Sequence, residues 1–251
     1  MRRFIQAIVL ANALLYMQVV NGHAFDDIPH LTVCGDAIDW RPYTYQTQSQ
    51  DEVDGFDKRI LDAALGKHGV SYDFIITSWS RCLKGTKNGT FDLSVSASYS
   101  DERADDYLYT DWYYTITPYY LFSSQQFPNG LNIKDVKDLE SYRVCGNFSY
   151  NYQDFQLSDI EPVGHSIPEL LRSLSSGECD VYLSWGEILY GNKTHREQPY
   201  IDEEFVFHPI PNMEPHKFYM LISRELESAD SLKALLDEQF QQLRVEEARS
   251  E

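Results

Sequence analysis

The sequence predicts an α/β fold, because apolar strand segments alternate with amphipathic helix segments along most of the chain. Two strand segments are alike: LTVCGD at 31–36 and YRVCGN at 142–147 both contain Val-Cys-Gly. Each is followed downstream by a second strand segment, GTFDLSVS at 89–96 and GECDVYLS at 177–184. This order indicates an internal duplication of strand, helix and strand, although short apolar matches also arise by chance.

Three segments have the periodicity of helices. GFDKRILDAALGKHG at 55–69 repeats apolar residues every three or four positions and stops at a glycine. SIPELLRSLSSG at 166–177 has Ser166 and Glu169 in the spacing of a capping box. The segment 228–243 spaces its leucines along one side of a helix. Strands that alternate with helices of this length favour parallel βαβ units.

The chain is expected to cross twice between two lobes. The aromatic run TPYYLFSS at 117–124 precedes the linker-like QQFPNG, and the proline-rich HPIPNMEPHKFYMLIS at 208–223 becomes strand-like again. Two crossings place residues 25–122 and 214–251 in lobe 1 and residues 123–213 in lobe 2. A cleft between the lobes follows from this arrangement.

Residues 1–24 predict a secretory signal peptide, with Arg2 and Arg3 before an apolar run and small residues Gly22 and Ala24 at its end. A retained membrane anchor is the alternative, because the apolar run approaches spanning length. Cleavage favours a periplasmic protein without stable membrane insertion. It also changes the formal net charge from -18 to -20, because the leader carries two arginines. Such an acidic surface repels nucleic acid and anionic membranes.

Four cysteines follow the leader: Cys34, Cys82, Cys145 and Cys179. In an oxidising compartment they predict two disulfides, for which three pairings are possible. Neither a CxxC nor an HExxH spacing occurs, so no metal site is predicted. No Walker, GxGxxG or GxSxG pattern occurs either, and no cofactor is predicted.

Several segments together resemble family 3 of the extracellular solute-binding proteins, the amino-acid type with the two-lobed type II periplasmic binding fold. The resemblance covers essentially the whole mature chain and depends on the order and spacing of its segments. These are LTVCGDAIDWRPYTY, VDGFDKRILDAAL, Trp79 ahead of LKGTKNGTFDLSVSASYSDER, TDWYYTITPYYLF, DVKDLESYRV, GECDVYLS and KFYMLISRE. The resemblance implies a mixed, mostly parallel sheet flanked by helices in each lobe, and two hinge crossings.

The cysteine in VCGD and the Arg-Cys-Leu after Trp79 resemble an uncharacterised branch of this family with cysteines in both lobes. This resemblance favours the pairs Cys34 with Cys82 and Cys145 with Cys179, because each pair then lies within one lobe. Disulfides that joined the lobes would hinder hinge closure.

The resemblance also assigns a role to Arg103 in SASYSDER, at the place where family members hold the carboxylate of the ligand. A guanidinium offers a planar fork of donors for two oxygens, and the Ser98 hydroxyl and nearby backbone amides are expected to converge with it. Ligands of open α/β sheets bind outside the strand ends. The alternative is that Arg103 pairs with Asp101, Asp105 or Asp106 on a solvated face.

Aromatic residues are expected to form the walls of the site. Trp40, Tyr43 and Trp79 stand where family members place aromatic side chains against the ligand, and core packing is the alternative for each. Asp36 and Asp39 lie in the first strand-to-helix loop. They could accept hydrogen bonds from an ammonium or amide, or only cap the turn.

Lobe 2 departs from the family pattern in two places. Trp185 stands where members that bind α-amino acids carry an aspartate for the ammonium, and its ring face attracts cations only by cation–π contact. The turn after the second Val-Cys-Gly carries Asn147, Phe148, Ser149 and Tyr150 in place of small residues. Its backbone amides could still meet a ligand, while the rings would shrink the pocket or stack on the ligand. We therefore expect a small carboxylate-bearing ligand with an apolar or flat body.

These features predict a periplasmic solute-binding protein, acting as a monomer, that captures an amino acid or related metabolite in the interlobe cleft. Because no second hydrophobic span precedes Glu251, transport or sensing is expected to need a separate membrane partner, a permease or a sensor. The alternative is an enzyme similar to the cyclohexadienyl dehydratases, which share this fold, with Glu187 as general acid. A glutamate that merely suits the first turn of a helix is the simpler interpretation.

Overall fold

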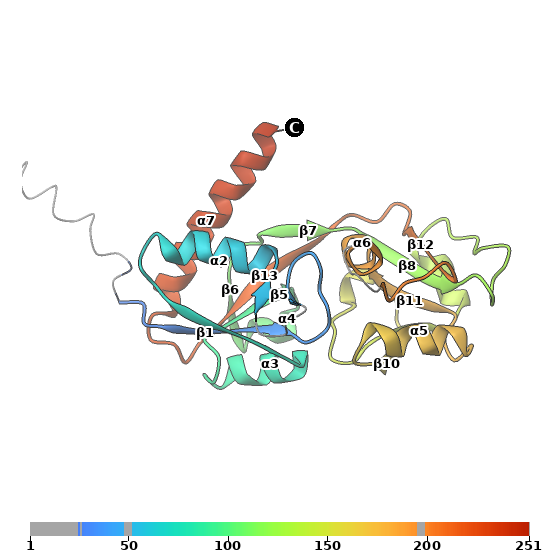
Figure 1. The fold of residues 1–251 in the computed structure, drawn as a ribbon, viewed down its shortest axis with the longest axis horizontal. Coiled ribbons are helices and arrows are strands. Elements are labelled where there is room, and N and C mark those ends of the chain that lie inside the picture. Colours follow the sequence, from blue (N-terminus) through green and yellow to red (C-terminus); the bar gives the residue numbers. More distant parts are fainter. Residues whose placement is uncertain (1–24, 26, 48–51, 195–198, 251) are drawn as a thin grey trace, which may run out of the picture.

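The structure is a computed structural model that describes residues 25, 27–47, 52–194 and 199–250. It has two lobes, each built around its own sheet, and the chain crosses twice between them (Figure 1). Helices and strands alternate in both lobes, which confirms the α/β class and the two-lobed fold expected from the sequence. The signal peptide expected for residues 1–24 lies outside the described residues.

Lobe 1 contains a sheet with the strand order β4-β1-β5-β13-β6, and β7 also pairs with β13. The strands are β1 (Leu31–Asp36), β4 (Tyr72–Thr77), β5 (Leu93–Ser98), β6 (Tyr107–Tyr109), β7 (Tyr114–Ile116) and β13 (His216–Ser223). β1 runs parallel to β4 and β5, whereas β13 is antiparallel to β5, β6 and β7. Most residues of β1 are buried, as expected for a central strand that is covered on both faces.

Helices cover both faces of the lobe 1 sheet. They are α2 (Phe56–Gly66), α3 (Trp79–Lys87), the single turn α4 (Asp101–Ala104) and α7 (Ala229–Ser250). α2 and α7 contact each other on one face, and α3 lies on the other (Figure 1). Ile60, Leu61, Ala64 and Leu65 form the buried stripe of α2, as the spacing in the sequence predicts. The short strands β2 (Tyr45–Gln46) and β3 (Val53–Asp54) pair with each other ahead of α2.

Lobe 2 contains a second sheet with the order β10-β9-β11-β8-β12. The strands are β8 (Pro118–Ser123), β9 (Val144–Asn147), β10 (Ile160–Gly164), β11 (Val181–Trp185) and β12 (Phe205–Pro209). The helices are α5 (Ile167–Ser175), α6 (Gly186–Thr194) and the 3-10 turns η1 (Val136–Ser141) and η2 (Gln153–Phe155). β9 is parallel to β10 and β11, and β8 is antiparallel to β11 and β12.

The two sheets repeat one strand order. β4-β1-β5-β13 in lobe 1 corresponds to β10-β9-β11-β8 in lobe 2, in each case three parallel strands followed by an antiparallel one. The two Val-Cys-Gly strands, β1 and β9, are the middle strands of the parallel sets. The topology therefore agrees with the duplication indicated by the sequence.

The first crossing differs from the expected boundary after residue 122. β8, residues 118–123, pairs on both sides with strands of lobe 2 and not with lobe 1. The crossing therefore lies between β7 and β8. The sequence could not show this, because an aromatic run with high strand propensity does not indicate which of two sheets it joins. The second crossing is the segment 210–215 between β12 and β13, which contains the expected boundary.

The helix predicted at 166–177 forms, but without its capping box. Ser166 precedes α5 in an extended conformation, and its side chain accepts no capping hydrogen bond. The carboxylate of Glu169 instead accepts a hydrogen bond of 2.7 Å from the backbone N–H of His165. The helix start was predicted correctly. The capping box was not, because Glu169 accepts from the N–H of His165 and not from that of Ser166.

Both disulfides expected from the resemblance are present. Cys34 of β1 is bonded to Cys82 of α3, and Cys145 of β9 to Cys179, two residues before β11. Each bridge therefore attaches a neighbouring segment to a Val-Cys-Gly strand within one lobe. Neither bridge restrains movement of the lobes relative to each other.

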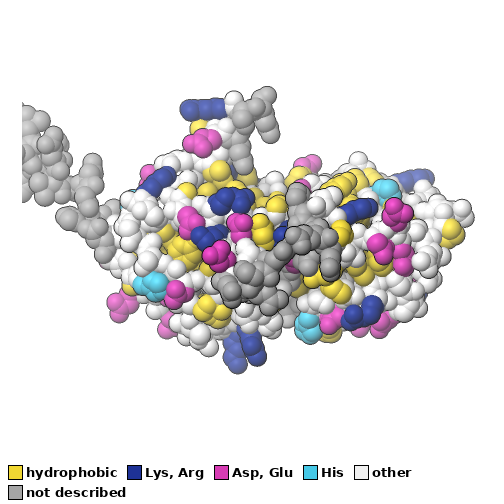
Figure 2. Space-filling view, in the orientation of Figure 1, with side chains coloured by type: hydrophobic (Ala, Val, Ile, Leu, Met, Phe, Trp, Pro, Cys, Tyr) yellow, Lys and Arg dark blue, Asp and Glu magenta, His cyan; other side chains and the backbone are white. Residues whose placement is uncertain are grey.

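Acidic side chains are spread over the visible face of the molecule. On the face shown in Figure 2, acidic side chains lie on both lobes and do not gather into one patch. Within the described ranges, no helix combines the length and the apolar character that crossing a membrane requires.

Candidate ligand-binding site between the lobes

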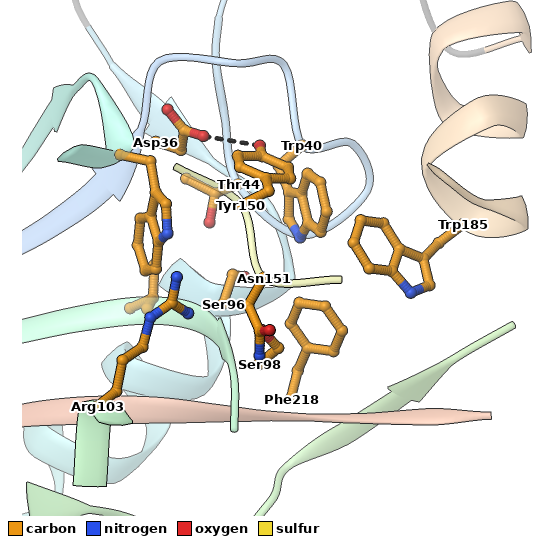
Figure 3. Close-up of a pocket in the computed structure, with 12 residues that line it drawn as sticks. Asp36, Trp40, Thr44, Ser96, Ser98, Arg103, Tyr150, Asn151, Trp185 and Phe218 are labelled. Carbon is orange, nitrogen blue, oxygen red and sulfur yellow. Dashed lines mark hydrogen bonds between the residues drawn. The ribbon is translucent and has the colours of Figure 1, made fainter. Parts of the chain in front are cut away.

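A cavity lies between the two lobes, beyond the ends of β1 and β5 (Figure 3). Lobe 1 contributes Asp36, Trp40, Thr44, Trp79, Val95, Ser96, Ser98, Arg103 and Phe218, and lobe 2 contributes Tyr150, Asn151 and Trp185. The volume open to the centre of a water-sized sphere is about 30 Å³, which is room for roughly two or three water molecules. The cleft is therefore nearly filled by the protein's own side chains.

Arg103 reaches the cavity from the single-turn helix α4. Its backbone N–H donates to the Ser100 hydroxyl at 3.2 Å, and this N-cap turns the chain at the end of β5. The guanidinium donates to the backbone carbonyl of Ser149 in lobe 2 at 3.2 Å and lies 5.8 Å from the centre of the Trp79 ring. Burial lowers the pKa of Arg103, but a guanidinium remains charged in proteins.

The carboxylates near Arg103 in the sequence are not its partners. Asp101 accepts from the hydroxyl of Tyr99, and Asp106 forms an ion pair with Lys87 at 2.7 Å. In the part of the chain that the structure describes, no carboxylate lies within ion-pair distance of the Arg103 guanidinium. The alternative of a solvated ion pair with Asp101, Asp105 or Asp106 is therefore not what the structure contains.

Asp36, the last residue of β1, contributes the carboxylate of the cavity. One oxygen accepts a hydrogen bond of 2.7 Å from the hydroxyl of Tyr150, which reaches across from lobe 2 (Figure 3). The other is 3.4 Å from the backbone N–H of Ile38. Burial raises the pKa of Asp36 to about 6, and the hydrogen bond from Tyr150 partly opposes this shift. Among the described residues that line the cavity, Arg103 is the one cation and Asp36 the one carboxylate.

Indole rings of both lobes form the apolar wall. The rings of Trp40 and Trp185 meet edge to face at 5.3 Å across the cleft, and Trp40 is 5.7 Å from the Tyr150 ring. The Trp40 indole donates to the hydroxyl of Tyr114, and the Trp185 indole donates to His216. Because both indole N–H groups are satisfied away from the cavity, the two rings present mainly carbon atoms to it.

A buried carboxylate behind the cavity orients part of the lobe 1 wall. Asp57, in the first turn of α2, is fully buried and accepts hydrogen bonds from the hydroxyls of Thr44, Ser96 and Tyr113. Thr44 and Ser96 also line the cavity. Burial raises the pKa of Asp57, and the three hydroxyls oppose the shift. Asp57 therefore positions two lining side chains without lining the cavity itself.

Four of the expected site residues do not line the cavity. Tyr43 stacks on Tyr114 with ring centres 3.9 Å apart, which is the core-packing alternative. The Asp39 side chain pairs with Arg41 at 2.8 Å. Asn147 is buried and accepts from the hydroxyl of Tyr182 at 2.7 Å. Ser149 contributes only its carbonyl, through the hydrogen bond from Arg103.

Three backbone amides of the lobe 2 turn are already used within the protein. The N–H of Asn147 donates to the Tyr152 hydroxyl at 2.8 Å, that of Phe148 to the Gly164 carbonyl at 3.0 Å, and that of Tyr150 to the Asn147 carbonyl at 3.4 Å. In the closed form these three amides are therefore already paired, and the expectation that amides of this turn meet a ligand stays a prediction. The Tyr152 hydroxyl covers the end of β9 at Asn147, and backbone carbonyls accept from the other two amides.

Sequence reasoning missed five lining residues: Thr44, Val95, Ser96, Asn151 and Phe218. Ser96 was detectable, because alternate residues of a strand share a face and Ser96 is two positions from Ser98. Phe218 was not detectable, because it reaches the site through pairing of β13 with Ser98 of β5 across 120 positions of sequence.

The lobes are in contact across the cleft. Ser149, Tyr150 and Asn151 each form a hydrogen bond to lobe 1, the last through its side-chain amide to the Tyr99 carbonyl at 2.7 Å. At the rim, the side chain of Asn192 in α6 donates to the Asp39 carbonyl at 2.9 Å. The structure therefore has the geometry of a closed two-lobed protein.

Glu187, on which the enzyme alternative depended, lies outside the cavity. Its carboxylate accepts hydrogen bonds from the backbone N–H and the hydroxyl of Thr117, at 2.9 and 3.0 Å. Thr117 is the residue between β7 and β8, so Glu187 fixes the start of α6 to the first crossing. Its position matches the simpler interpretation, a glutamate in the first turn of a helix.

Two solved structures are similar over most of the chain. One is a histidine kinase sensor domain with similarity to periplasmic binding proteins, with a TM-score of 0.70 and 18% identity over 89% of this chain and 93% of that one. The other is the amino acid ABC transporter substrate-binding protein AbpA from Streptococcus pneumoniae, bound to L-arginine, with a TM-score of 0.68 and 18% identity over 89% and 92% of the two chains. At this identity the likeness concerns the fold.

A curated relative is the L-cystine-binding protein TcyA of Bacillus subtilis, which is 26% identical over 145 residues. The match covers 57% of this chain and 52% of TcyA, so it spans about half of the relative. The model of the bacterial extracellular solute-binding proteins, family 3, matches residues 31–247. These relatives are binding proteins, which supports a binding function over an enzymatic one. The chain belongs to family 3 of the bacterial extracellular solute-binding proteins.

Proposed function

We propose that this protein captures a small carboxylate-bearing solute, an amino acid or a related metabolite, in the cleft between its lobes. The observation that supports this most strongly is Arg103, a guanidinium at the cleft with which no carboxylate of the described residues forms an ion pair. It donates to a single neutral carbonyl in the closed form. A carboxylate is a stronger acceptor, and it matches the fork of a guanidinium with two oxygens.

Lobe 1 is the docking surface for the charged groups of the ligand. Arg103 receives the carboxylate, with the Ser98 hydroxyl beside it, and Asp36 accepts a hydrogen bond from an ammonium, amide or hydroxyl elsewhere on the ligand. Trp79, Trp40 and Trp185 then enclose the apolar or flat part of the ligand. Other family members bind the ammonium of the ligand with an aspartate of lobe 2. Trp185 stands at that position here and carries no charge, so Asp36 of lobe 1 takes this role.

Closure of the lobes completes the site. Ligand contacts made from both sides stabilise the closed form relative to the open one, and the ligand is then sealed from solvent. The protein acts as a monomer outside the cytoplasmic membrane, in the periplasm. It delivers its ligand, or reports its presence, to a separate membrane protein, and the similar structures include both a transporter component and a sensor domain.

Replacement of Arg103 by Ala tests this proposal. We expect the ligand found by a calorimetric screen of amino acids and small carboxylic acids to bind the variant more weakly by about 2 to 5 kcal/mol, or about 30- to 5,000-fold. Arg172→Ala, an exposed arginine on α5 of lobe 2, is the matched control and should leave the affinity unchanged. An affinity that is the same for wild type and Arg103→Ala would show that the ligand is not bound by Arg103 in the cleft.

A further inference from the structure

We propose that Tyr150 is an internal occupant of the ligand site, and that the ligand is a planar carboxylic acid whose ring carries a hydrogen-bond donor. The ligand enters by displacing Tyr150 and then presents the same groups to the cleft. This inference depends on the proposed function, because it concerns the same cleft and the same Arg103.

Tyr150 fills the space between the lobes. It belongs to the lobe 2 turn between β9 and η2, yet its ring packs against Trp40 and its hydroxyl bonds to Asp36, both in lobe 1. It also packs against the apolar cluster that contains Trp79 and Cys82. Figure 3 shows the Tyr150 ring beside Trp40, with its hydroxyl on the dashed line to Asp36. The 30 Å³ that remain are too small for an amino acid.

The lobe 2 turn that contains Tyr150 presents three groups to lobe 1 in a fixed order. The carbonyl oxygen of Ser149 accepts from the Arg103 guanidinium, the ring of Tyr150 lies against the indole of Trp40, and the phenol donates to the Asp36 carboxylate. An acceptor, a flat ring and a donor beyond the ring are thus placed in sequence across the cleft. A free molecule with a carboxylate, an aromatic ring and a hydroxyl or amino group on the far side of the ring offers the same groups.

The hydrogen bonds that hold the turn around Tyr150 against lobe 1 all cross between the lobes. The bonds Arg103 to Ser149, Tyr150 to Asp36 and Asn151 to the Tyr99 carbonyl all break when the lobes separate. Opening therefore withdraws the Tyr150 ring from lobe 1, and the ring must take another position for the lobes to close over a ligand. The self-filled closed form and the ligand-filled closed form compete, and the fraction of self-filled protein lowers the apparent affinity for ligand.

The first experiment measures closure without ligand, by small-angle X-ray scattering. We expect wild-type protein to be mostly closed, and Tyr150→Phe and Tyr150→Ala to have a larger radius of gyration, the second more than the first. Tyr152→Phe is the matched control, because among the described residues the Tyr152 hydroxyl forms hydrogen bonds only with Asn147 of its own lobe. If both Tyr150 variants keep the wild-type radius of gyration, Tyr150 does not hold the lobes together and the inference is wrong.

The second experiment measures binding of two probes, 4-hydroxyphenylacetate and phenylacetate, which differ by one hydroxyl. We expect Tyr150→Ala to bind 4-hydroxyphenylacetate at least 10-fold more tightly than wild type does. We also expect the hydroxylated probe to bind this variant at least 10-fold more tightly than phenylacetate, and Asp36→Asn in the same background to remove that preference. Absence of binding of both probes to Tyr150→Ala would overturn the assigned ligand class.

The two proposals fail in different ways. If carboxylic acids bind with a strong dependence on Arg103 while the Tyr150 variants change neither shape nor affinity, the proposed function stands and the internal occupant is refuted. If no carboxylate in the screen depends on Arg103, the proposed function itself fails, whatever the scattering measurement gives.

Discussion

The two lobes have the same architecture and offer opposite chemistry to the cleft. β1 and β9 both contain Val-Cys-Gly, both are held by a disulfide within their lobe, and both end in a polar residue directly after the glycine. In lobe 1 that residue is Asp36, which faces the cavity with its charge. In lobe 2 it is Asn147, which is turned into the lobe by hydrogen bonds from Tyr182 and Tyr152.

Close packing over the two glycines accounts for this difference. A Cβ atom on Gly146 would lie 2.4 Å from the ring of Tyr152, so the missing side chain allows that ring to cover the end of β9. A Cβ atom on Gly35 would meet the Thr44 methyl at 2.9 Å, and Thr44 is a lining residue of the cavity. The two glycines are equivalent, but Gly146 leaves room for the Tyr152 ring in lobe 2 and Gly35 leaves room for the lining residue Thr44 in lobe 1. The strand pattern determines the fold, and the residues just beyond the strand determine the chemistry of each wall.

Removal of a disulfide has the largest expected effect on stability. It tests whether the two lobes depend equally on their bridges. Replacing Cys34 and Cys82 together by Ala should destabilise the protein by about 4 kcal/mol, and so should replacing Cys145 and Cys179, because loops of 48 and 34 residues lose similar closure entropy. Urea unfolding of the two double variants measures this. A loss confined to one pair would show that only one lobe needs its bridge.

The Asp36 carboxyl gives the next largest effect and sharpens the contrast with Asn147. Because the folded pKa of about 6 lies above the usual aspartate pKa of 3.8, the folded protein holds this proton more tightly than the unfolded chain does. Relative to Asp36→Asn, wild type should be most stable below about pH 4 and should lose about 3 kcal/mol as the pH rises to 7. The difference in unfolding free energy between the two proteins at each pH measures this and cancels the titration of other groups.

An unchanged difference between wild type and Asp36→Asn across this range would contradict the assignment of a raised pKa to Asp36. Asn147→Ala is the lobe 2 counterpart, since Asn147 does not titrate. It should lower the stability by an amount that does not vary with pH.

The rim contact between the lobes gives the smallest effect. Asn192→Ala removes the hydrogen bond to the Asp39 carbonyl and should favour the open form by about 1 kcal/mol. Small-angle scattering without ligand would detect the shift in population, and Lys193→Ala, on the next residue of α6, is the control. A shift of the same size in both variants would mean that the helix as a whole, and not this bond, holds the rim.

Local patterns predicted the fold well because the determinants of each element lie close together in the sequence. The buried stripe of α2, the terminal helix and the two Val-Cys-Gly strands follow from spacing alone. β8 was assigned to the wrong lobe because its determinants lie far away in the sequence. The choice of sheet depends on pairing with β11 and β12. Strand propensity contains no information about distant partners.

The lining residues that were predicted from the sequence come from both sides of the cleft. Arg103, Ser98, Trp79, Trp40 and Asp36 follow lobe 1 strands or begin helices in it, and they all line the cavity. On the lobe 2 side, Tyr150 and Trp185 also line it. The closed turn around Tyr150 could not be derived from residue types, since the hydrogen bonds from Tyr152 and to Asp36 depend on how the two lobes meet.

The most direct test of the account is a double-mutant cycle between Arg103 and the carboxylate of the ligand. Calorimetry would compare the best ligand of the screen with its carboxamide, for wild type and for Arg103→Ala. We predict that wild type binds the acid about 30- to 5,000-fold more tightly than the amide, and that the variant binds the two equally. A variant that keeps the full preference for the acid would contradict the claim that Arg103 holds the carboxylate.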